Sequence, residues 1–265
     1  MDVWWTSAAG RYLAQWEQAQ LDSLVPDWFG YHAVQLGMPE IEALRANRMS
    51  HRWVLGALEE PTLGQAHQQA GESVQAWVHA EALPFAADSL DLVVMPHTLE
   101  LSEDPHACVR EVFRVLRPEG RLVIVGLSPW SWWGLSQWRR RWCERLGWSR
   151  FDWGRLFLPH GGDFLAPGRV RDWLQLMGME LEVTRHGIYR PAVQDPVWLE
   201  RWAWLDRIGT RWWPYLGSAY VITAVKKVPA MRLLSPRRRA RAALRAKPAT
   251  AATTIGASKH TKTTL

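Results

Sequence analysis

The 265-residue chain contains only two cysteines, Cys108 and Cys143, and their spacing fits neither a disulfide framework nor a metal site. We therefore expect a reducing cytoplasm and no bound metal. No run of about 18 apolar residues is present, so the sequence predicts no transmembrane helix. The opening residues MDVWWTSAAG lack a basic region and a long apolar region, and they predict no signal peptide.

Several catalytic signatures are also missing from the chain. It has no G-x-S-x-G nucleophile turn, no H-E-x-x-H zinc motif, no C-x-x-C pair and no lysine-bearing phosphate loop. These absences remove the commonest alternative enzyme classes.

Lysine is absent before Lys226, and the charges divide sharply along the chain. Residues 226–265 contain eleven Lys or Arg and no acid, whereas residues 1–225 carry 21 arginines and all 26 acids, a net charge of −5. Residues 227–265 are rich in Ala, Arg, Lys and Thr, a composition that predicts a disordered basic tail. Two interpretations of the tail are open: contact with nucleic acid or another acidic surface, or a purely solubilising role.

The most regular stretch predicts a strand, a helix and a second strand. Leu90–Met95 is an apolar run typical of a parallel strand that is covered on both faces. Asp104 and Pro105 are typical of a helix N-cap and first helical residue, and Pro118 ends the helix. Arg121–Leu127 is a second buried strand. The helix carries one apolar stripe, formed by Cys108, Val109, Val112, Phe113 and Leu116.

The same stretch resembles the second half of a class I S-adenosylmethionine-dependent methyltransferase of the type 11 domain group. The resemblance is carried by the order A-E-A-L-P-F, L-D, H-x-L-E, D-P and E-x-x-R-V-L-R-P-x-G. The matching residues are Ala80–Phe85, Asp91, His97, Leu99, Glu100, Asp104, Pro105, Glu111, Arg114, Val115, Leu116, Arg117, Pro118 and Gly120. It implies a doubly wound, mostly parallel seven-stranded α/β sheet, methyltransferase activity and S-adenosyl-L-methionine as cofactor.

This organisation gives one methyltransferase-like α/β domain over residues 1–226 and the tail over 227–265. We expect one or two helices within 1–30, covering a sheet edge or a cofactor cleft. Further strands are expected at 32–37, 50–60, 74–79, 179–185 and 217–226, and a helix at 168–178. The last strand is expected to enter the sheet antiparallel, as the resemblance implies.

The resemblance places the family's glycine-rich first turn after the strand at 32–37, where relatives have an acid and several glycines. This chain has Gly37 alone, followed by Met38 and Pro39, and Gln35 stands where the acid is common. Glycines let the backbone approach the cofactor, so Gly37 is a candidate contact, whereas Met38 and Pro39 are not expected to form the same open turn. A helix beginning after the turn would still favour a carboxylate at its N-terminus.

Five more residues are candidate cofactor contacts at the carboxyl ends of later strands. Glu59, 22 residues after Gly37, is a candidate for the ribose hydroxyls, with Glu60 beside it; the other interpretation is an exposed acid pair. His79 stands where relatives often hold the adenine with an aspartate, and Ala80 follows it; a surface histidine is the alternative. Pro96 and His97 follow the strand predicted at Leu90–Met95. His97 is also a weak candidate for proton transfer, or it only caps the loop.

Two aromatic segments interrupt the α/β order, at 129–167 and at 196–216, and we expect insertion or lid helices there. In the first, Trp132, Trp133, Trp138, Trp142, Trp148 and Trp153 interleave with six arginines. Three interpretations are open: a lid that grips an apolar substrate, a basic amphipathic helix on a membrane surface, or ordinary core with a solvated face. For the second segment we expect one helix with a structural aromatic stripe.

Two functions of different class follow. The first is an S-adenosylmethionine-dependent methyltransferase whose small-molecule or macromolecular acceptor is unknown. Methyl transfer depends mainly on binding and alignment, so the lack of a fixed catalytic residue is expected. The second is a non-catalytic module of the same fold that has lost cofactor binding, suggested by the altered first turn and by His79. A third and weaker hypothesis is association with nucleic acid through the tail.

Overall fold

The computed structural model describes residues 7–57, 74–136, 138, 163–191, 193 and 195–227. Contacts divide the chain into two units, Met1–Val228 and Pro229–Leu265. The described residues all belong to the first unit, so the predicted basic tail lies outside them apart from Lys227. Within the described residues no helix is both long and apolar enough to cross a bilayer.

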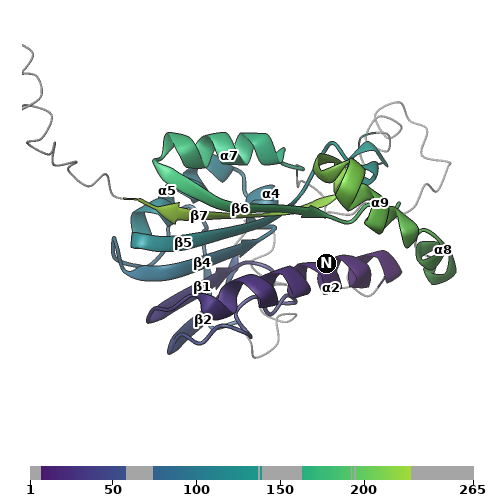
Figure 1. Cartoon of the computed structure of the whole chain (residues 1–265). Coiled ribbons are helices and arrows are strands. Elements are labelled where there is room, and N and C mark those ends of the chain that lie inside the picture. Colours follow the sequence, from purple (N-terminus) through teal and green to yellow (C-terminus); the bar gives the residue numbers. More distant parts are fainter. Residues whose placement is uncertain are drawn as a thin grey trace, which may run out of the picture. The chain divides into compact units, whose positions relative to one another are not determined.

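A seven-stranded sheet forms the centre of the first unit, in the order β3-β2-β1-β4-β5-β7-β6 (Figure 1). The pairs among β1 to β5 are parallel, and β7 is antiparallel to both β5 and β6. The predicted doubly wound α/β fold is therefore confirmed. The strands are β1 His32–Leu36, β2 His51–Ala57, β3 Ala76–Val78, β4 Leu90–Pro96, β5 Leu116–Leu127, β6 Met179–Gly187 and β7 Ala219–Lys226.

Helices cover both faces of the sheet, with α2 on one face and α5 and α7 on the other (Figure 1). The helices are α2 Ala8–Leu24, α4 Thr98–Leu101, α5 Pro105–Val115, α7 Pro167–Leu176, α8 Pro196–Arg201 and α9 Trp204–Trp212, with short 3-10 turns η1 Val25–Asp27 and η3 Pro214–Leu216. The Ser7 hydroxyl caps α2 by accepting from the Gly10 N–H at 3.1 Å. The Asp104 side chain caps α5 in the same way, as the D-P pair predicts.

Successive side chains along the central strands point to opposite faces of the sheet, so each face has its own part of the core. Val34 and Leu36 of β1 pack with α5 and α7, whereas Ala33 packs with Leu21 and Leu24 of α2. Strand β7 is buried along its whole length, which explains why most of its residues are apolar. Helix α2 thus covers a sheet face and not a sheet edge.

Two boundaries differ from the sequence prediction. Helix α5 ends at Val115, and β5 begins at Leu116, before the proline that was expected to stop the helix. The ammonium of Lys226 donates to the carbonyls of Phe113 at 2.8 Å and Leu116 at 2.7 Å and pairs with Asp88 at 2.6 Å. A cation therefore caps the carboxyl end of α5, where the helix dipole favours it.

The single helix expected over 196–216 is wrong, because the segment folds as α8, α9 and η3 with a turn at residues 202–203. Its aromatic residues are largely exposed and do not form a packed stripe, with Trp212 70% and Tyr215 71% accessible. Helices α8 and α9 lie at the end of the sheet where β1, β4 and β5 finish (Figure 1).

Candidate functional site at the carboxyl end of the sheet

The candidate site lies where β1 and β4, neighbours in the sheet, reach their carboxyl ends. The chain continues from β1 to β2 on one side of this point and from β4 to β5 on the other. Such a reversal of strand order opens a crevice outside the strand ends in doubly wound sheets. Gly37 follows β1 at this point, and His97 follows β4.

The backbone turns sharply after β1 because two successive residues take a left-handed conformation. Gly37 has φ +80°, and Met38 has φ 41°, which is costly for a residue with a side chain. Met38 does form the bend, so the expectation that it could not adopt a glycine-like conformation is wrong. No helix follows, since residues 37–50 form only turns and irregular structure. The prediction that a helix N-terminus here would bind a ligand carboxylate is therefore wrong as well.

The side chain of Gln35 holds this bend in place. Its amide donates to the carbonyls of Met38 at 2.9 Å and Ile41 at 2.6 Å, and its oxygen accepts from the Ala43 N–H at 2.9 Å. Gln35 is buried, so these bonds are shielded from water. In this chain Gln35 acts as an internal brace for the turn and compensates the strain at Met38.

The side chain of Met38 points into the core. It is buried with Leu21 and Ile41 in the core beneath α2. The bend instead approaches Thr98 closely, because a Cβ atom on Gly37 would lie 2.8 Å from the Thr98 hydroxyl oxygen. Thr98 donates through this oxygen to the carbonyl of Leu36, which joins the ends of β1 and β4 directly.

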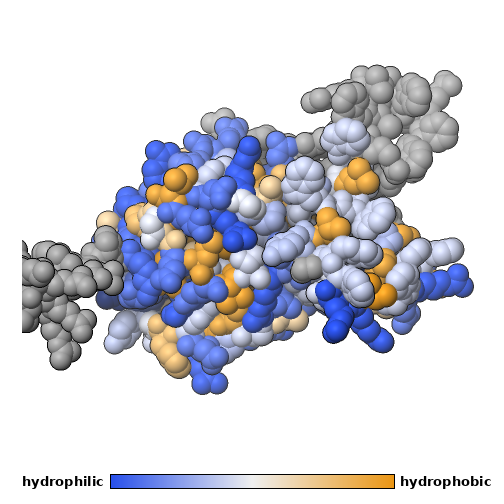
Figure 2. Space-filling view, turned by 45° about the horizontal axis from the view of Figure 1, so that its top comes forward, coloured by the Kyte–Doolittle hydropathy of each residue, from blue (hydrophilic) through white to orange (hydrophobic). Residues whose placement is uncertain are grey.

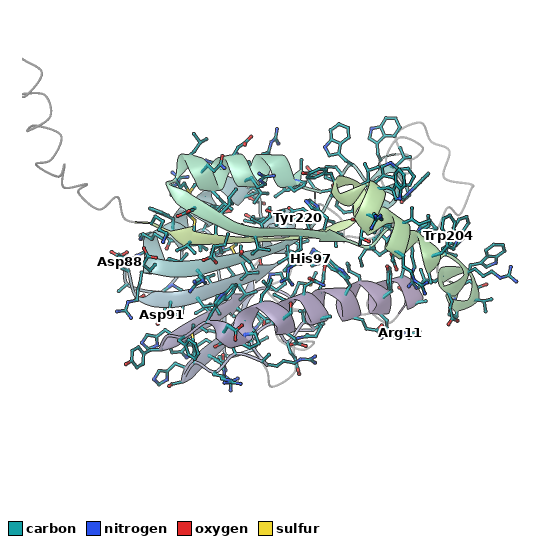
Figure 3. The ribbon with its side chains drawn as sticks, viewed as in Figure 1. Arg11, Asp88, Asp91, His97, Trp204 and Tyr220 are labelled. Atoms are coloured by element: carbon teal, nitrogen blue, oxygen red, sulfur yellow. The ribbon has the colours of Figure 1, made fainter. Side chains whose placement is uncertain are left out.

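His97 lies in a buried charged cluster at the end of β4. Its Nε2 is 2.9 Å from Glu17 Oε1 of α2, and its Nδ1 is 2.8 Å from Glu100 Oε2 of α4. The three side chains are buried, and the second oxygen of Glu17 has no partner among the described residues. Figure 3 shows His97 between α2 and the sheet, with Tyr220 nearby. The cluster therefore ties α2 to the carboxyl end of β4.

The charge state of this cluster follows from its two carboxylates. Burial disfavours an imidazolium, but Glu17 and Glu100 outweigh this effect and raise the pKa of His97 to about 10. Burial also raises the pKa of the Glu100 carboxyl. At neutral pH the imidazole is protonated and donates from both ring nitrogens, so in this arrangement it has no lone pair with which to accept a proton.

The cluster continues into β5 and β7. Glu100 Oε1 accepts the N–H of Leu127 at the end of β5. The hydroxyl of Tyr220 approaches the same region, and a Cβ on Gly126 would lie 2.6 Å from it. Burial and the neighbouring Glu100 raise the pKa of Tyr220. One carboxylate thus links the ends of β4 and β5, and a glycine provides the necessary space.

Several residues that carry the sequence resemblance hold loops in place. Glu111 accepts from the Leu83 N–H at 3.0 Å, and Arg114 donates to the Phe85 carbonyl at 2.9 Å, so α5 clamps the A-L-P-F segment. Glu81 accepts from the Ser102 hydroxyl at 3.1 Å and thereby joins the loop after β3 to the loop after α4. These contacts give the glutamate and the arginine of the E-x-x-R pattern a structural role.

The predicted cofactor contacts fall into three groups. Gly37, Pro96 and His97 lie together, since the Pro96 carbonyl is 3.6 Å from a Cβ built on Gly37. His79 and Ala80 lie at the end of β3, where His79 is exposed and Ala80 is buried. Glu59, with Glu60, lies outside the described residues. The assignment of these residues to a cofactor stays a prediction.

A large cavity opens at the carboxyl end of β5. It has a volume of about 1040 Å³, and most of its lining is apolar. Asp163 and Arg169 are its only charged lining residues among those described. The lining comprises Pro129, Trp130, Ser131, Trp132, Gly134, Leu135, Trp138, Asp163, Phe164, Leu165, Ala166, Arg169, Trp213 and Leu216. The aromatic segment after β5 thus lines a cavity, while residues 139–162 lie outside the description.

A polar network connects α9 to α2. Helix α9 directly precedes Trp213 and Leu216, which line the cavity. The Tyr12 hydroxyl donates to Asp206 Oδ1 at 2.7 Å, and Arg190 Nε donates to Asp206 Oδ2 at 2.7 Å. The Arg190 guanidinium also lies 4.4 Å from the centre of the Tyr12 ring. Burial and Asp206 raise the pKa of Tyr12.

Around α9 the surface is mostly pale in Figure 2, because tryptophan and tyrosine have intermediate hydropathy.

Sequence reasoning missed Gln35 as a brace and Glu17 and Glu100 as partners of His97. A polar residue inside the apolar strand HAVQL was a signal for Gln35. Glu17 gave a weaker signal, since it lies on the buried side of α2 among Leu13 and Leu21. Nothing local indicated that it would meet a residue 80 positions later in the chain.

Comparison with known proteins supports a specific family. Residues 42–124 match the family described as methyltransferase domain. The uncharacterised protein YafS of Escherichia coli is 29% identical over 68% of this chain and 65% of its own length. The biotin biosynthesis bifunctional protein BioHC of Saccharophagus degradans is 29% identical over 67% of this chain. The chain thus spans less than two thirds of the length of each relative, 65% of YafS and 30% of BioHC.

Shorter matches concern quinone methylation. The ubiquinone/menaquinone biosynthesis C-methyltransferase UbiE of Klebsiella pneumoniae is 40% identical over 22% of this chain and 22% of its own length. Among solved structures, a methyltransferase of Thermotoga maritima, titled a possible histamine N-methyltransferase, covers 85% of this chain and 94% of its own, with a TM-score of 0.56 and 17% identity. An S-adenosylmethionine-dependent methyltransferase of Mesorhizobium loti covers 80% of this chain and 97% of its own, with a TM-score of 0.50 and 18% identity. Both share the fold described above.

Proposed function

We propose that this chain is an S-adenosylmethionine-dependent methyltransferase that transfers a methyl group to an apolar acceptor; the match of residues 42–124 to a methyltransferase domain and the fold shared with solved methyltransferases support the proposal. Family and fold imply S-adenosyl-L-methionine as the cofactor. When bound, that cofactor supplies a methyl group on a sulfonium, and the protein mainly has to align the acceptor with it. The observation that carries the proposal is the large apolar cavity at the carboxyl end of β5.

The residues proposed to hold the cofactor are those at the strand ends. Gly37 and Pro96 are proposed for the methionine side, together with the backbone of His97; His79 and Ala80 are proposed for the base, and Glu59 for the ribose. The bend at Gly37 supports this fit, since it keeps a glycine-like backbone path while the Met38 side chain is buried in the core. The role proposed for His97 is to hold the end of β4 against α2 through Glu17, and the proposal includes no proton transfer.

The acceptor proposed for the cavity is an aromatic compound with an apolar substituent. A volume of about 1040 Å³ lies at the upper end of the range of about 300–1,000 Å³ typical of small-molecule pockets. Tryptophan side chains offer flat apolar faces for stacking on a ring. Matched relatives named for quinone biosynthesis and for a 2-methoxy-6-polyprenyl-1,4-benzoquinol support the same acceptor class. A carbon acceptor also needs little acid–base assistance.

Calorimetry tests cofactor binding separately from the acceptor. We expect saturable heat when the full chain is titrated with S-adenosylmethionine or with its demethylated product S-adenosylhomocysteine. Absence of heat at millimolar ligand would leave a methyltransferase fold without cofactor, which is the alternative drawn from the sequence.

Transfer of labelled methyl groups tests the acceptor class. The chain is incubated with methyl-labelled S-adenosylmethionine and a benzoquinol bearing a short prenyl chain, and the organic phase is counted. Leu216→Glu places a charge in the cavity lining and should raise the KM for the benzoquinol at least tenfold. Leu176→Glu is the matched control, because Leu176 is 81% exposed on α7 and does not line the cavity. Cofactor binding without any organic-phase label would reject the acceptor class but not the cofactor.

A further inference from the structure

A second, polar cavity lies between α7, β6, α9 and η3, away from the bend at Gly37. Its volume is about 290 Å³, just below the range of about 300–1,000 Å³ typical of small-molecule pockets. None of its lining residues is an acid, and all of them carry a group that can form hydrogen bonds. The lining residues are Arg171, Thr184, His186, Tyr189, Thr210 and Tyr215.

An irregularity in β6 brings two of these residues to the α7 side of the sheet. The register with β7 shifts between Leu181 and Val183. After the shift, Arg185 donates from its Nη1 to Gln20 and Ser23 of α2, on the opposite face. Thr184 and His186 alternate with it and line the cavity together with Arg171 of α7.

Two nitrogen atoms of this cavity are buried without a hydrogen-bond partner among the described residues. They are Arg171 Nε, which can only donate, and His186 Nδ1. Buried polar nitrogens are nearly always paired in folded proteins, so two such atoms around one polar cavity indicate a missing partner. The Thr210 hydroxyl, which donates to the carbonyls of Asp206 and Arg207, is not within hydrogen-bond reach of either nitrogen.

The electrostatics of the cavity favour a negatively charged partner. Burial, and then the positive charge of Arg171, lower the pKa of His186. Among the described residues, no carboxylate lines the cavity to offset Arg171. The other titratable groups facing His186 are phenols: Tyr215 of η3, whose ring stands edge-on at 5.7 Å, and Tyr220 of β7 at 6.5 Å.

We propose that this cavity binds a small oxyanion, a phosphate or carboxylate group, through Arg171 and His186, with the hydroxyls of Thr184 and Tyr215 as further donors. Arginine presents its N–H groups in a fork that matches the oxygens of both groups. The site is additional to the proposed methyl transfer and does not depend on it. The 3-10 turn η3 separates the two cavities, with Trp213 and Leu216 beside the apolar one and Tyr215 beside the polar one.

Titration calorimetry on the full chain tests the proposal with inorganic phosphate, with sodium acetate and with sodium chloride at matched ionic strength. We expect saturable binding of phosphate or acetate but not of chloride. Arg171→Met should weaken that binding at least tenfold. Arg169→Met is the matched control, since it removes the same charge two residues earlier on α7 but lines the apolar cavity, and it should change affinity less than twofold.

A site-specific readout separates this cavity from the basic tail, which also attracts anions. The imidazole resonance of His186, assigned by its loss in His186→Gln, should shift on saturation, and the pKa of His186 should rise in the complex. His186→Gln should itself weaken binding. Saturable heat that is unchanged in Arg171→Met, or a His186 resonance that does not respond, would overturn the proposal. If phosphate binds and acetate does not, the oxyanion is a phosphate group.

Discussion

Replacing His97 by leucine tests the charged cluster that joins α2 to the end of β4. The substitution leaves the carboxylates of Glu17 and Glu100 buried without their shared cation. Removing one partner of a buried ion pair typically costs about 3–5 kcal/mol, because the remaining charge stays desolvated. Since a domain is stable by only about 5–15 kcal/mol, His97→Leu should unfold at a much lower denaturant concentration than the native chain.

The native cluster should also make stability depend on pH in a defined direction. The pKa of His97 is about 10 in the folded protein and 6.5 without the fold, so the folded state holds an extra proton between these values. Stability from this proton is fully present below pH 6.5 and is lost as the pH rises through 10. The shift corresponds to about 5 kcal/mol, at most about 1.4 kcal/mol per pH unit.

Urea unfolding followed by tryptophan fluorescence measures this slope. The free energy of unfolding should fall steadily between about pH 6.5 and about pH 9 in the native chain and much less in His97→Leu. His186, whose pKa is lowered in the fold, acts in the opposite direction near pH 6.5 but does so equally in both chains, so the difference between their slopes reports His97. Asp22→Asn on α2 is the control, since it breaks only the exposed pair with Arg45 and should leave the pH slope unchanged.

A double variant decides whether charge or packing causes the loss. Glu17→Leu combined with His97→Leu removes one unpaired carboxylate as well as the cation. Apolar replacement of a buried ion pair is often tolerated, so the double variant should be more stable than His97→Leu alone. A pH-independent stability in the native chain, or a double variant no more stable than His97→Leu alone, would refute the reasoning.

Two further substitutions test the strand ends. Gly37→Ala should destabilise the fold and weaken S-adenosylmethionine binding more than Gly178→Ala, measured by thermal unfolding and calorimetry; both residues have positive φ, but only Gly37 meets a neighbour, Thr98 at 2.8 Å. Equal effects would mean that backbone strain alone matters. Lys226→Met should cost about 1.5–3 kcal/mol in urea unfolding, because it removes charged hydrogen bonds to the end of α5; Lys227→Met, which breaks an exposed pair with Glu119, should have little effect.

The sheet could be predicted from sequence wherever a strand is buried on both faces. Runs such as Leu90–Met95 can satisfy their apolar side chains only in the middle of a layered fold, and β4 lies there. The D-P pair fixed the start of α5 for a similarly local reason, since capping involves residues three apart. The family resemblance added the strand order, which periodicity does not contain.

Prediction failed where a residue is held by distant partners. Met38 takes a left-handed conformation that its own chemistry disfavours, and only the four hydrogen bonds of the Gln35 side chain to residues 37–43 explain why. Glu17 meets His97 across 80 residues, which no local pattern encodes. The break between α8 and α9 was missed because their aromatic residues are exposed, so the stripe did not mark a packed face.

The unexpected conformation of Met38 bears on the question of cofactor binding. A missing glycine motif suggests a lost binding turn only if the backbone path itself requires those glycines. In this chain Gln35 fixes the bend from within, and the Met38 side chain lies in the core beneath α2. The altered residues therefore changed what supports the turn and left its course after β1 glycine-like. The motif's absence is accordingly a weaker argument against a methyltransferase than the sequence alone suggests.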